Sequence, residues 1–216
     1  MIKKFDRRRY NFHIWLARIF RLLLVAIIAN IFTQNWLNLF TSILTLILTY
    51  LPFFIAERNH FYIPAPFQII ILLFIFASLY LGELQQYYHK FWWWDIMLHT
   101  LSGVILGFVG FLLVFLLNKE KQVNVVLSPL FIAIFSFTFA VTVGVIWEIF
   151  EFTMDSIFAL NMQKSGLVDT MWDLIVDSIG AFLVSLFGYF YSKNNSTSYF
   201  KNILEQFKYE DNYLKR

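Results

Sequence analysis

The sequence TMWDLIVDSIGAFLVSLFGYFY, residues 170–191, decides the fold because it joins an apolar run to two aspartates near its start. A helix needs roughly 20 apolar residues to cross a bilayer. Asp173 and Asp177 are four residues apart, so both lie on one face of such a helix. An ionisable group inside an apolar span is by default a functional-site candidate. The stretch therefore predicts a membrane-spanning helix that contributes to a polar site.

The composition of the whole chain agrees with a membrane protein. Hydrophobic residues make up 59% of the chain and charged residues only 14%, against about 45–50% and roughly 25% in soluble domains. The chain has no cysteine, which excludes disulfides, thiolate nucleophiles and zinc–thiolate sites. Its basic residues lie in tails and short loops beside apolar segments, so we expect the anionic lipid surface as their partner and not nucleic acid.

Similar apolar runs predict an all-α polytopic transmembrane helix bundle of about six spans. The region 22–56 has no charged residue, is too long for one span and suits two helices joined at Thr33-Gln34-Asn35. We expect a basic cytoplasmic tail over 1–13, a transmembrane bundle over 14–192, and a tail over 193–216 with a short amphipathic helix. The expected spans are 14–32, 36–56, 67–82, 95–117, 127–151 and 170–191.

The basic residues also predict an orientation. With six spans and a cytoplasmic N-terminus, fifteen of the seventeen Lys and Arg residues lie inside, and only Lys90 and Lys164 lie outside. This asymmetry follows the positive-inside rule and places both termini in the cytoplasm. The start of the fourth span, the end of the fifth and the start of the sixth then lie together on the outer side.

Ionisable residues recur at helical spacing at those three outer ends. No Lys or Arg lies within the segments to neutralise them, so a cation, shared protons or a water-filled cavity must compensate for the clustered charge. The set consists of Asp95 and His99, then Glu148, Glu151 and Asp155, then Asp169, Asp173 and Asp177.

Structural explanations compete with a functional one for part of this set. Asp95 and Asp169 suit helix N-caps, and Asp155 suits the loop after the fifth span. For Glu148 and Glu151, expected near a helix C-terminus, the helix dipole disfavours negative charge. Small residues in the same spans, such as Gly103, favour close helix packing.

A carboxylate-rich set with one imidazole suits Mg, Mn, Ca or Zn. We expect Glu148, Glu151, Asp173 and Asp177 to hold a divalent metal. His99 serves as a ligand or general base. Asp95, Asp155 and Asp169 form the supporting polar cluster.

Three motifs carry a family resemblance: WWDIMLHTLSG (93–103), WEIFE (147–151) and GLVDTMWDLIVDSIGA (166–181). Together they resemble the YjdF-like family of uncharacterised bacterial multi-pass membrane proteins, over roughly residues 50–191. The resemblance implies a bacterial cell membrane location and names no activity. The chain is more distantly similar to VanZ-like proteins, which are linked to glycopeptide resistance and the cell envelope. The matching positions are His99, then Glu148 or Glu151, then Asp173 or Asp177; Asp177 stands where the VanZ-like pattern often has Asn.

Three functions stay open at this point. The first is a metal-dependent membrane enzyme that acts on a lipid or lipid-linked envelope substrate from the outer leaflet. The second is a proton or cation transporter that uses the same carboxylates as a relay. The third is a non-catalytic scaffold whose polar cluster joins helices. The sequence does not specify the substrate, the metal or the oligomeric state.

Overall fold

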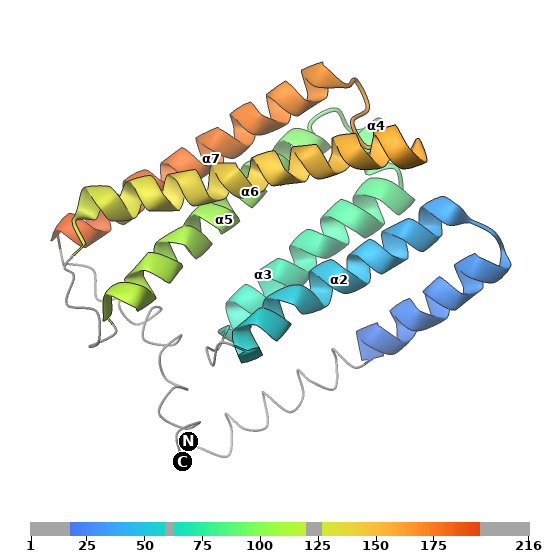
Figure 1. The fold of residues 1–216 in the computed structure, drawn as a ribbon, viewed down its shortest axis with the longest axis horizontal. Helices are drawn as coiled ribbons and strands as arrows, with labels where there is room; N and C mark the ends of the chain where they lie inside the picture. The colour runs from blue at the N-terminus through green and yellow to red at the C-terminus, as the bar shows by residue number, and fades with distance from the viewer. Residues whose placement is uncertain (1–17, 59–62, 120–126, 195–216) are drawn as a thin grey trace, which may run out of the picture. The chain divides into compact units, whose positions relative to one another are not determined.

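The computed structural model describes residues 18–58, 63–119 and 127–194, and every regular element within these ranges is helical (Figure 1). The described residues form two compact units, residues 18–86 and residues 87–194. The all-α prediction is therefore confirmed for the described part of the chain.

The N-terminal unit contains a helix over residues 18–32 followed by α2 (Trp36–Arg58) and α3 (Ala65–Ile75). The predicted turn at 33–35 is confirmed, and Gln34 adopts a φ of 55° there. Asn30 donates through Nδ2 to Ser42 Oγ at 3.3 Å, which joins the first helix to α2. Such bonds between helices help association where lipid supplies no hydrophobic driving force.

The helix α3 continues directly into a π-helix, η1 (Phe76–Leu84). The Gln85 amide donates to the Tyr80 carbonyl at 2.9 Å, five residues back, as a π-helical turn requires. The predicted span over 67–82 is confirmed as a helical segment. Its π geometry was not predicted, because apolar periodicity does not distinguish a π-turn from an α-turn.

The C-terminal unit begins with the short α4 (Tyr87–Lys90) and is built on three long helices that pack side by side (Figure 1). They are α5 (Trp94–Lys119), α6 (Pro129–Phe158) and α7 (Leu167–Asn194). Their shared core includes Phe111, Ala140 and Ala181, which are almost fully buried. This three-helix core holds the candidate site.

Two glycines allow α5 and α7 to cross in direct backbone contact. A Cβ atom built on Gly103 would lie 2.2 Å from the carbonyl oxygen of Asp177. A Cβ atom built on Gly180 would lie 2.3 Å from the carbonyl oxygen of Thr100. The packing role predicted for Gly103 is confirmed, and the close crossing sets the spacing of the polar side chains that flank it.

The helix α6 is longer than the predicted span over 127–151. It begins at Pro129, where Ser128 Oγ caps the Phe131 amide at 3.2 Å, and it continues to Phe158. The predicted end at Glu151 is wrong because the apolar run ends before the helix does. Asp155 consequently lies in the last turn of α6, and its expected place in a loop is wrong. Glu148 and Glu151 likewise lie inside the helix, further from its C-terminus than expected.

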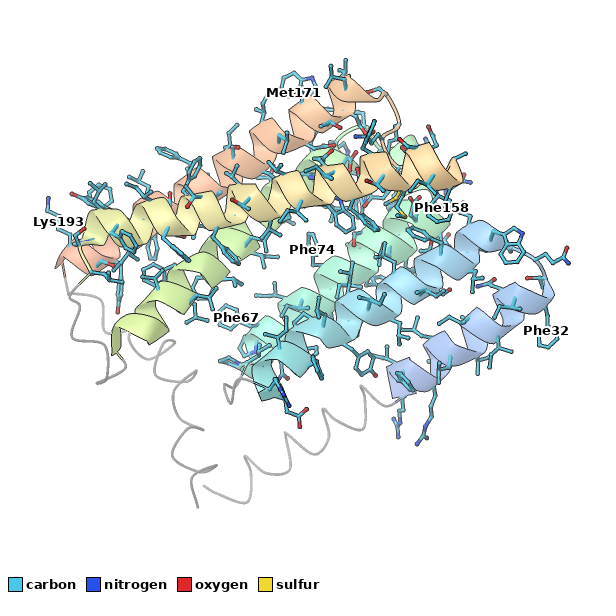
Figure 2. The ribbon with its side chains drawn as sticks, in the orientation of Figure 1. Phe32, Phe67, Phe74, Phe158, Met171 and Lys193 are labelled. Atoms are coloured by element: carbon cyan, nitrogen blue, oxygen red, sulfur yellow. The ribbon has the colours of Figure 1, made fainter. Side chains whose placement is uncertain are left out.

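Within the described residues, five segments are long and apolar enough to cross a membrane. Large apolar side chains at their surface point outward, as Figure 2 shows for Phe158 and Met171, whose exposed fractions are 61% and 48%. Such surfaces suit a lipid environment. Three parts of the prediction lie largely outside the described residues: the tail over 1–13, the start of the first span at residue 14 and the amphipathic helix in 193–216. The sixth span and the orientation therefore stay predictions. The five segments are Trp36–Arg58, Pro66–Leu84, Trp94–Val114, Pro129–Phe158 and Leu167–Lys193.

Candidate functional site

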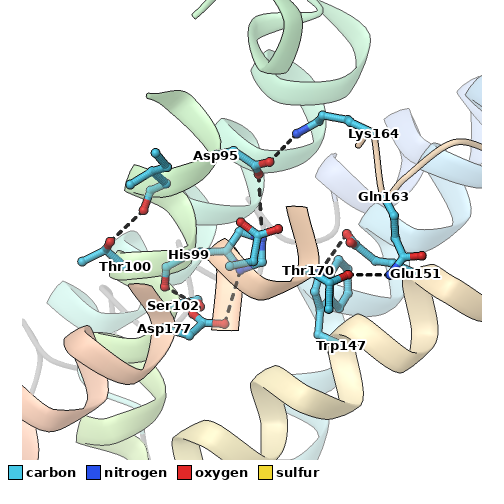
Figure 3. Close-up of polar contacts among 12 residues, drawn as sticks. Asp95, His99, Thr100, Ser102, Trp147, Glu151, Gln163, Lys164, Thr170 and Asp177 are labelled. Carbon is cyan, nitrogen blue, oxygen red and sulfur yellow. Dashed lines mark hydrogen bonds and ion pairs between the residues drawn. The ribbon is translucent and has the colours of Figure 1, made fainter. Parts of the chain in front are cut away.

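The site is organised around the imidazole of His99, which α5 places between three carboxylates (Figure 3). Its Nδ1 atom lies 3.3 Å from Oδ2 of Asp177 on α7. Its Nε2 atom lies 3.8 Å from Oδ1 of Asp95 and 3.8 Å from Oδ1 of Asp173. One edge of the ring is therefore hydrogen-bonded to α7, while the other faces two carboxylates from two helices.

Asp177 is only 4% exposed and is held from several sides. Ser102 Oγ lies within hydrogen-bond distance of Oδ1, and His99 lies beside Oδ2. A Cβ atom at Gly144 of α6 would lie 2.9 Å from Oδ2, so the glycine leaves room for this carboxylate. The Ser102 hydroxyl contacts the Asp177 carboxylate and lies 2.8 Å from the backbone carbonyl oxygen of His99. It makes no hydrogen bond to the His99 imidazole. This arrangement does not activate Ser102 as a nucleophile.

Asp95, His99 and Asp173 form a group that could hold a metal ion. One ligand atom from each residue can be chosen so that all three lie within 4.8 Å of one another. Two carboxylate oxygens and one imidazole nitrogen are suitable ligands for Mn or Zn. A metal-binding histidine commonly donates its other ring N–H to a carboxylate, which fixes its tautomer and orientation. Asp177 occupies that position beside Nδ1.

Lys164 is the cation that reaches this group within the described residues. Its Nζ atom forms an ion pair with Oδ2 of Asp95 and lies 4.0 Å from the centroid of the Tyr88 ring. No cation was expected within the spans, and Lys164 comes from the segment between α6 and α7. Its charge was the available signal, because Lys164 is one of the two basic residues that the positive-inside rule predicts on the outer side.

Asp155 fixes the segment that carries Lys164. Its two carboxylate oxygens accept the backbone amides of Met162 at 2.6 Å and Gln163 at 2.8 Å. The Gln163 side chain in turn donates to Thr170 Oγ1 at 2.6 Å. Asp155 therefore binds backbone at the edge of the site.

The two glutamates of α6 have different surroundings. Glu148 is 4% exposed, and neither of its carboxylate oxygens has a hydrogen-bond partner. The Thr170 hydroxyl lies near Glu148 without meeting hydrogen-bond geometry. Glu151 accepts a hydrogen bond from Trp147 Nε1 at 2.9 Å. The structure thus leaves Glu148 without a hydrogen bond and gives Glu151 a local partner.

Asp95 and Asp169 lie in the first turns of α5 and α7, inside the helices. Their predicted role as the N-cap residues themselves is wrong by two or three positions, since the helices begin at Trp94 and Leu167. Their negative charges are still favourably placed, because the dipole is positive at a helix N-terminus. The structure therefore brings Asp95, His99, Asp173 and Asp177 together and puts Asp169 at the start of α7.

The apolar helices and the buried polar cluster define an integral membrane protein with a carboxylate–histidine site in its C-terminal helical unit. The chain belongs to the family described as "Predicted membrane protein (DUF2238)", whose model matches residues 13–194. That description assigns a membrane location and no activity.

A curated protein from Thermotoga maritima is 29% identical to the chain over 134 residues. The match covers 62% of this chain and 67% of the relative, which is described only as "Uncharacterized protein". No solved structure matches the chain.

Proposed function

We propose that the protein is a metal-dependent membrane enzyme that acts on a lipid or lipid-linked envelope substrate. The observation that carries this proposal is the setting of His99. Its Nδ1 atom lies beside the Asp177 carboxylate, and its Nε2 atom faces Asp95 and Asp173. This is the arrangement of a metal-binding histidine with an orienting carboxylate.

In this proposal three atoms bind the metal ion: His99 Nε2, Asp95 Oδ1 and Asp173 Oδ1. The ligand set differs from the one expected from sequence, since Asp95 enters it and Asp177 orients the imidazole. The place of Glu151 in a metal site stays a prediction, and its bond to Trp147 favours a local role. A bound dication would polarise an oxygen of the substrate or lower the pKa of a water molecule.

The proposed substrate class follows from the position of the site in the bundle. Asp95 and Asp173 lie in the first two turns of α5 and α7, which are apolar helices long enough to cross a bilayer. Ends of spanning helices lie near lipid headgroups. The predicted orientation puts these ends in the outer leaflet of a bacterial cell membrane. The resemblance to YjdF-like and VanZ-like proteins, which stays a prediction, likewise favours an envelope substrate.

Transport of protons or cations has less support. A relay needs polar groups that continue along the helices beyond Asp177. The next buried hydroxyls are turned onto backbone carbonyls: Ser136 donates to Gly107 at 2.5 Å and Ser185 donates to Phe182 at 2.9 Å. Phe111, which is 1% exposed, fills the core further along α5. These contacts favour a site that is closed on the side away from Asp95.

Metal analysis of the purified protein in lipid nanodiscs tests the proposal. The protein is equilibrated with Mn²⁺ or Zn²⁺, dialysed, and compared with the His99→Gln and Asp173→Asn variants. We expect bound metal in the parent and a strong loss in both variants, with a cooperative thermal transition in chelator as the control for folding. Metal-loaded protein is then assayed for release of phosphate from lipid phosphates. A parent protein that binds no metal would overturn the proposal.

A further inference from the structure

Glu148 is a buried polar group that has no role in the metal site formed by Asp95, His99 and Asp173. Its side chain is 4% exposed, and neither carboxylate oxygen has a hydrogen-bond partner. A buried ionised carboxylate without compensation is strongly disfavoured. Glu148 also lies outside the group of atoms formed by Asp95, His99 and Asp173.

The helix packing shows where Glu148 is directed. Gly144, one turn before Glu148 on α6, lies against the Asp177 carboxylate of α7. Residues four apart share a helix face, so Glu148 lies one turn further along the same face. Asp173 lies one turn from Asp177 in the corresponding direction on α7. Glu148 therefore faces the cluster from α6, and the groups that act on it electrostatically include His99 and Asp177.

The carboxylates of the cluster outnumber the positive charges that one metal ion would bring. Four carboxylates converge here, and among the described residues Lys164 is the ammonium that pairs with one of them, Asp95. Lys164 and one dication together supply three positive charges against those four carboxylates. Glu151 and Asp169 lie near enough to add to the negative field. A single metal ion at Asp95, His99 and Asp173 consequently leaves Glu148 without a counter-charge.

We propose, building on the metal-dependent function above, that the site binds two divalent cations. The second cation lies between Glu148 and Asp173, with Asp173 bridging the two positions through its two oxygens. Glu148 is a ligand of the second cation only, and His99 is a ligand of the first cation only. Paired metal sites clamp the attacking and leaving oxygens of phosphoryl transfer, which favours a phosphate ester as the substrate class.

Manganese titration with electron paramagnetic resonance tests this inference on the full-length protein in nanodiscs. Two Mn²⁺ ions that share a carboxylate couple magnetically, whereas an isolated Mn²⁺ gives a six-line spectrum. We expect two ions per chain and a coupled spectrum for the parent at saturation. Glu148→Gln should bind one ion with a six-line spectrum. That remaining signal also shows that the first position is still folded.

Glu57→Gln is the matched control, because it removes an exposed carboxylate from the end of α2 in the N-terminal unit. It should keep two ions and the coupled spectrum. A parent that binds one ion, with no change in Glu148→Gln, would overturn the two-cation inference and leave the proposed function intact. A parent that binds no Mn²⁺ would overturn both. Loss of an ion in Glu57→Gln would contradict the assignment to Glu148.

Discussion

The Nδ1 atom of His99 lies 3.3 Å from Oδ2 of Asp177, so a residue of α7 orients the imidazole of α5. If Nε2 binds metal, this carboxylate sets the tautomer of the ring and raises its basicity. Asp177→Asn should therefore weaken Mn²⁺ binding by about 10–100-fold without abolishing it. Calorimetric titration measures the affinity, and His99→Gln supplies the comparison in which the ligand itself is lost. Unchanged affinity in Asp177→Asn would exclude the orienting role.

Glu148→Gln should change stability and metal binding in opposite directions. Without metal, the substitution removes a buried carboxylate that has no hydrogen-bond partner. Removing such a group should raise the free energy of unfolding by about 1–3 kcal/mol. We expect a higher thermal midpoint than the parent in chelator and a smaller gain on adding Mn²⁺. Thermal unfolding of both proteins in the same detergent, with and without metal, measures both effects. A lower midpoint in chelator would show that Glu148 is compensated.

Gly103 and Gly107 should differ sharply in their tolerance of alanine. A Cβ at Gly103 would meet the Asp177 carbonyl oxygen at 2.2 Å, whereas one at Gly107 would meet its nearest atom at 3.4 Å. Overpacking against a backbone atom cannot be relieved by a rotamer change, so Gly103→Ala should cost about 3 kcal/mol or more. Gly107→Ala should stay within about 1 kcal/mol of the parent because alanine also favours the helix. Equal midpoints for the two variants would contradict the close crossing.

Asp155→Ala should loosen the segment between α6 and α7. The carboxylate accepts the amides of Met162 and Gln163, and hydrogen bonds to a charged group contribute about 1.5–3 kcal/mol each. We expect faster deuterium exchange over residues 159–166 and little change elsewhere. Thr153→Ala is the control, because its hydroxyl bonds only within α6 at 2.7 Å. Slow exchange in Asp155→Ala would show that other contacts hold the segment.

Cysteine labelling tests the predicted topology, since the chain has no cysteine of its own. The positive-inside argument places Lys90 outside and Lys121 inside. In intact bacterial cells, a membrane-impermeant maleimide should label Lys90→Cys and should label Lys121→Cys only after the cells are opened. Labelling in the reverse order would invert the orientation and place the site in the inner leaflet.

The helices were predictable because apolar runs and turn residues report directly on local structure. The turn at 33–35 and the spans that contain Asp95 and Asp173 were found for this reason. The end of α6 was not, because Glu148, Glu151 and Asp155 interrupt the apolar run, and a helix continues through such positions when its polar side chains face other polar groups. Asp155 does so by binding backbone amides of the following segment.

The membership of the polar cluster was predictable, but its pairing was not. Helical spacing identifies residues that share a face, yet it does not specify how far one helix is rotated against another. The contacts from His99 on α5 to Asp173 and Asp177 on α7 depend on that rotation. Ser102 follows His99 by three residues on the same face of α5, but a serine in a helix commonly bonds its own backbone and so does not indicate a site. Lys164 was missed because it lies outside the predicted spans.

The reciprocal contact of Gly103 and Gly180 has a mechanical consequence. With backbone against backbone on both sides of the crossing, α5 and α7 have no compressible side chains between them and cannot slide closer. Asp95 and Asp173 both lie on the N-terminal side of this crossing along their helices. The backbones that carry these two carboxylates can therefore separate by a scissor-like rotation about the crossing, which leaves the contact at Gly103 and Gly180 in place.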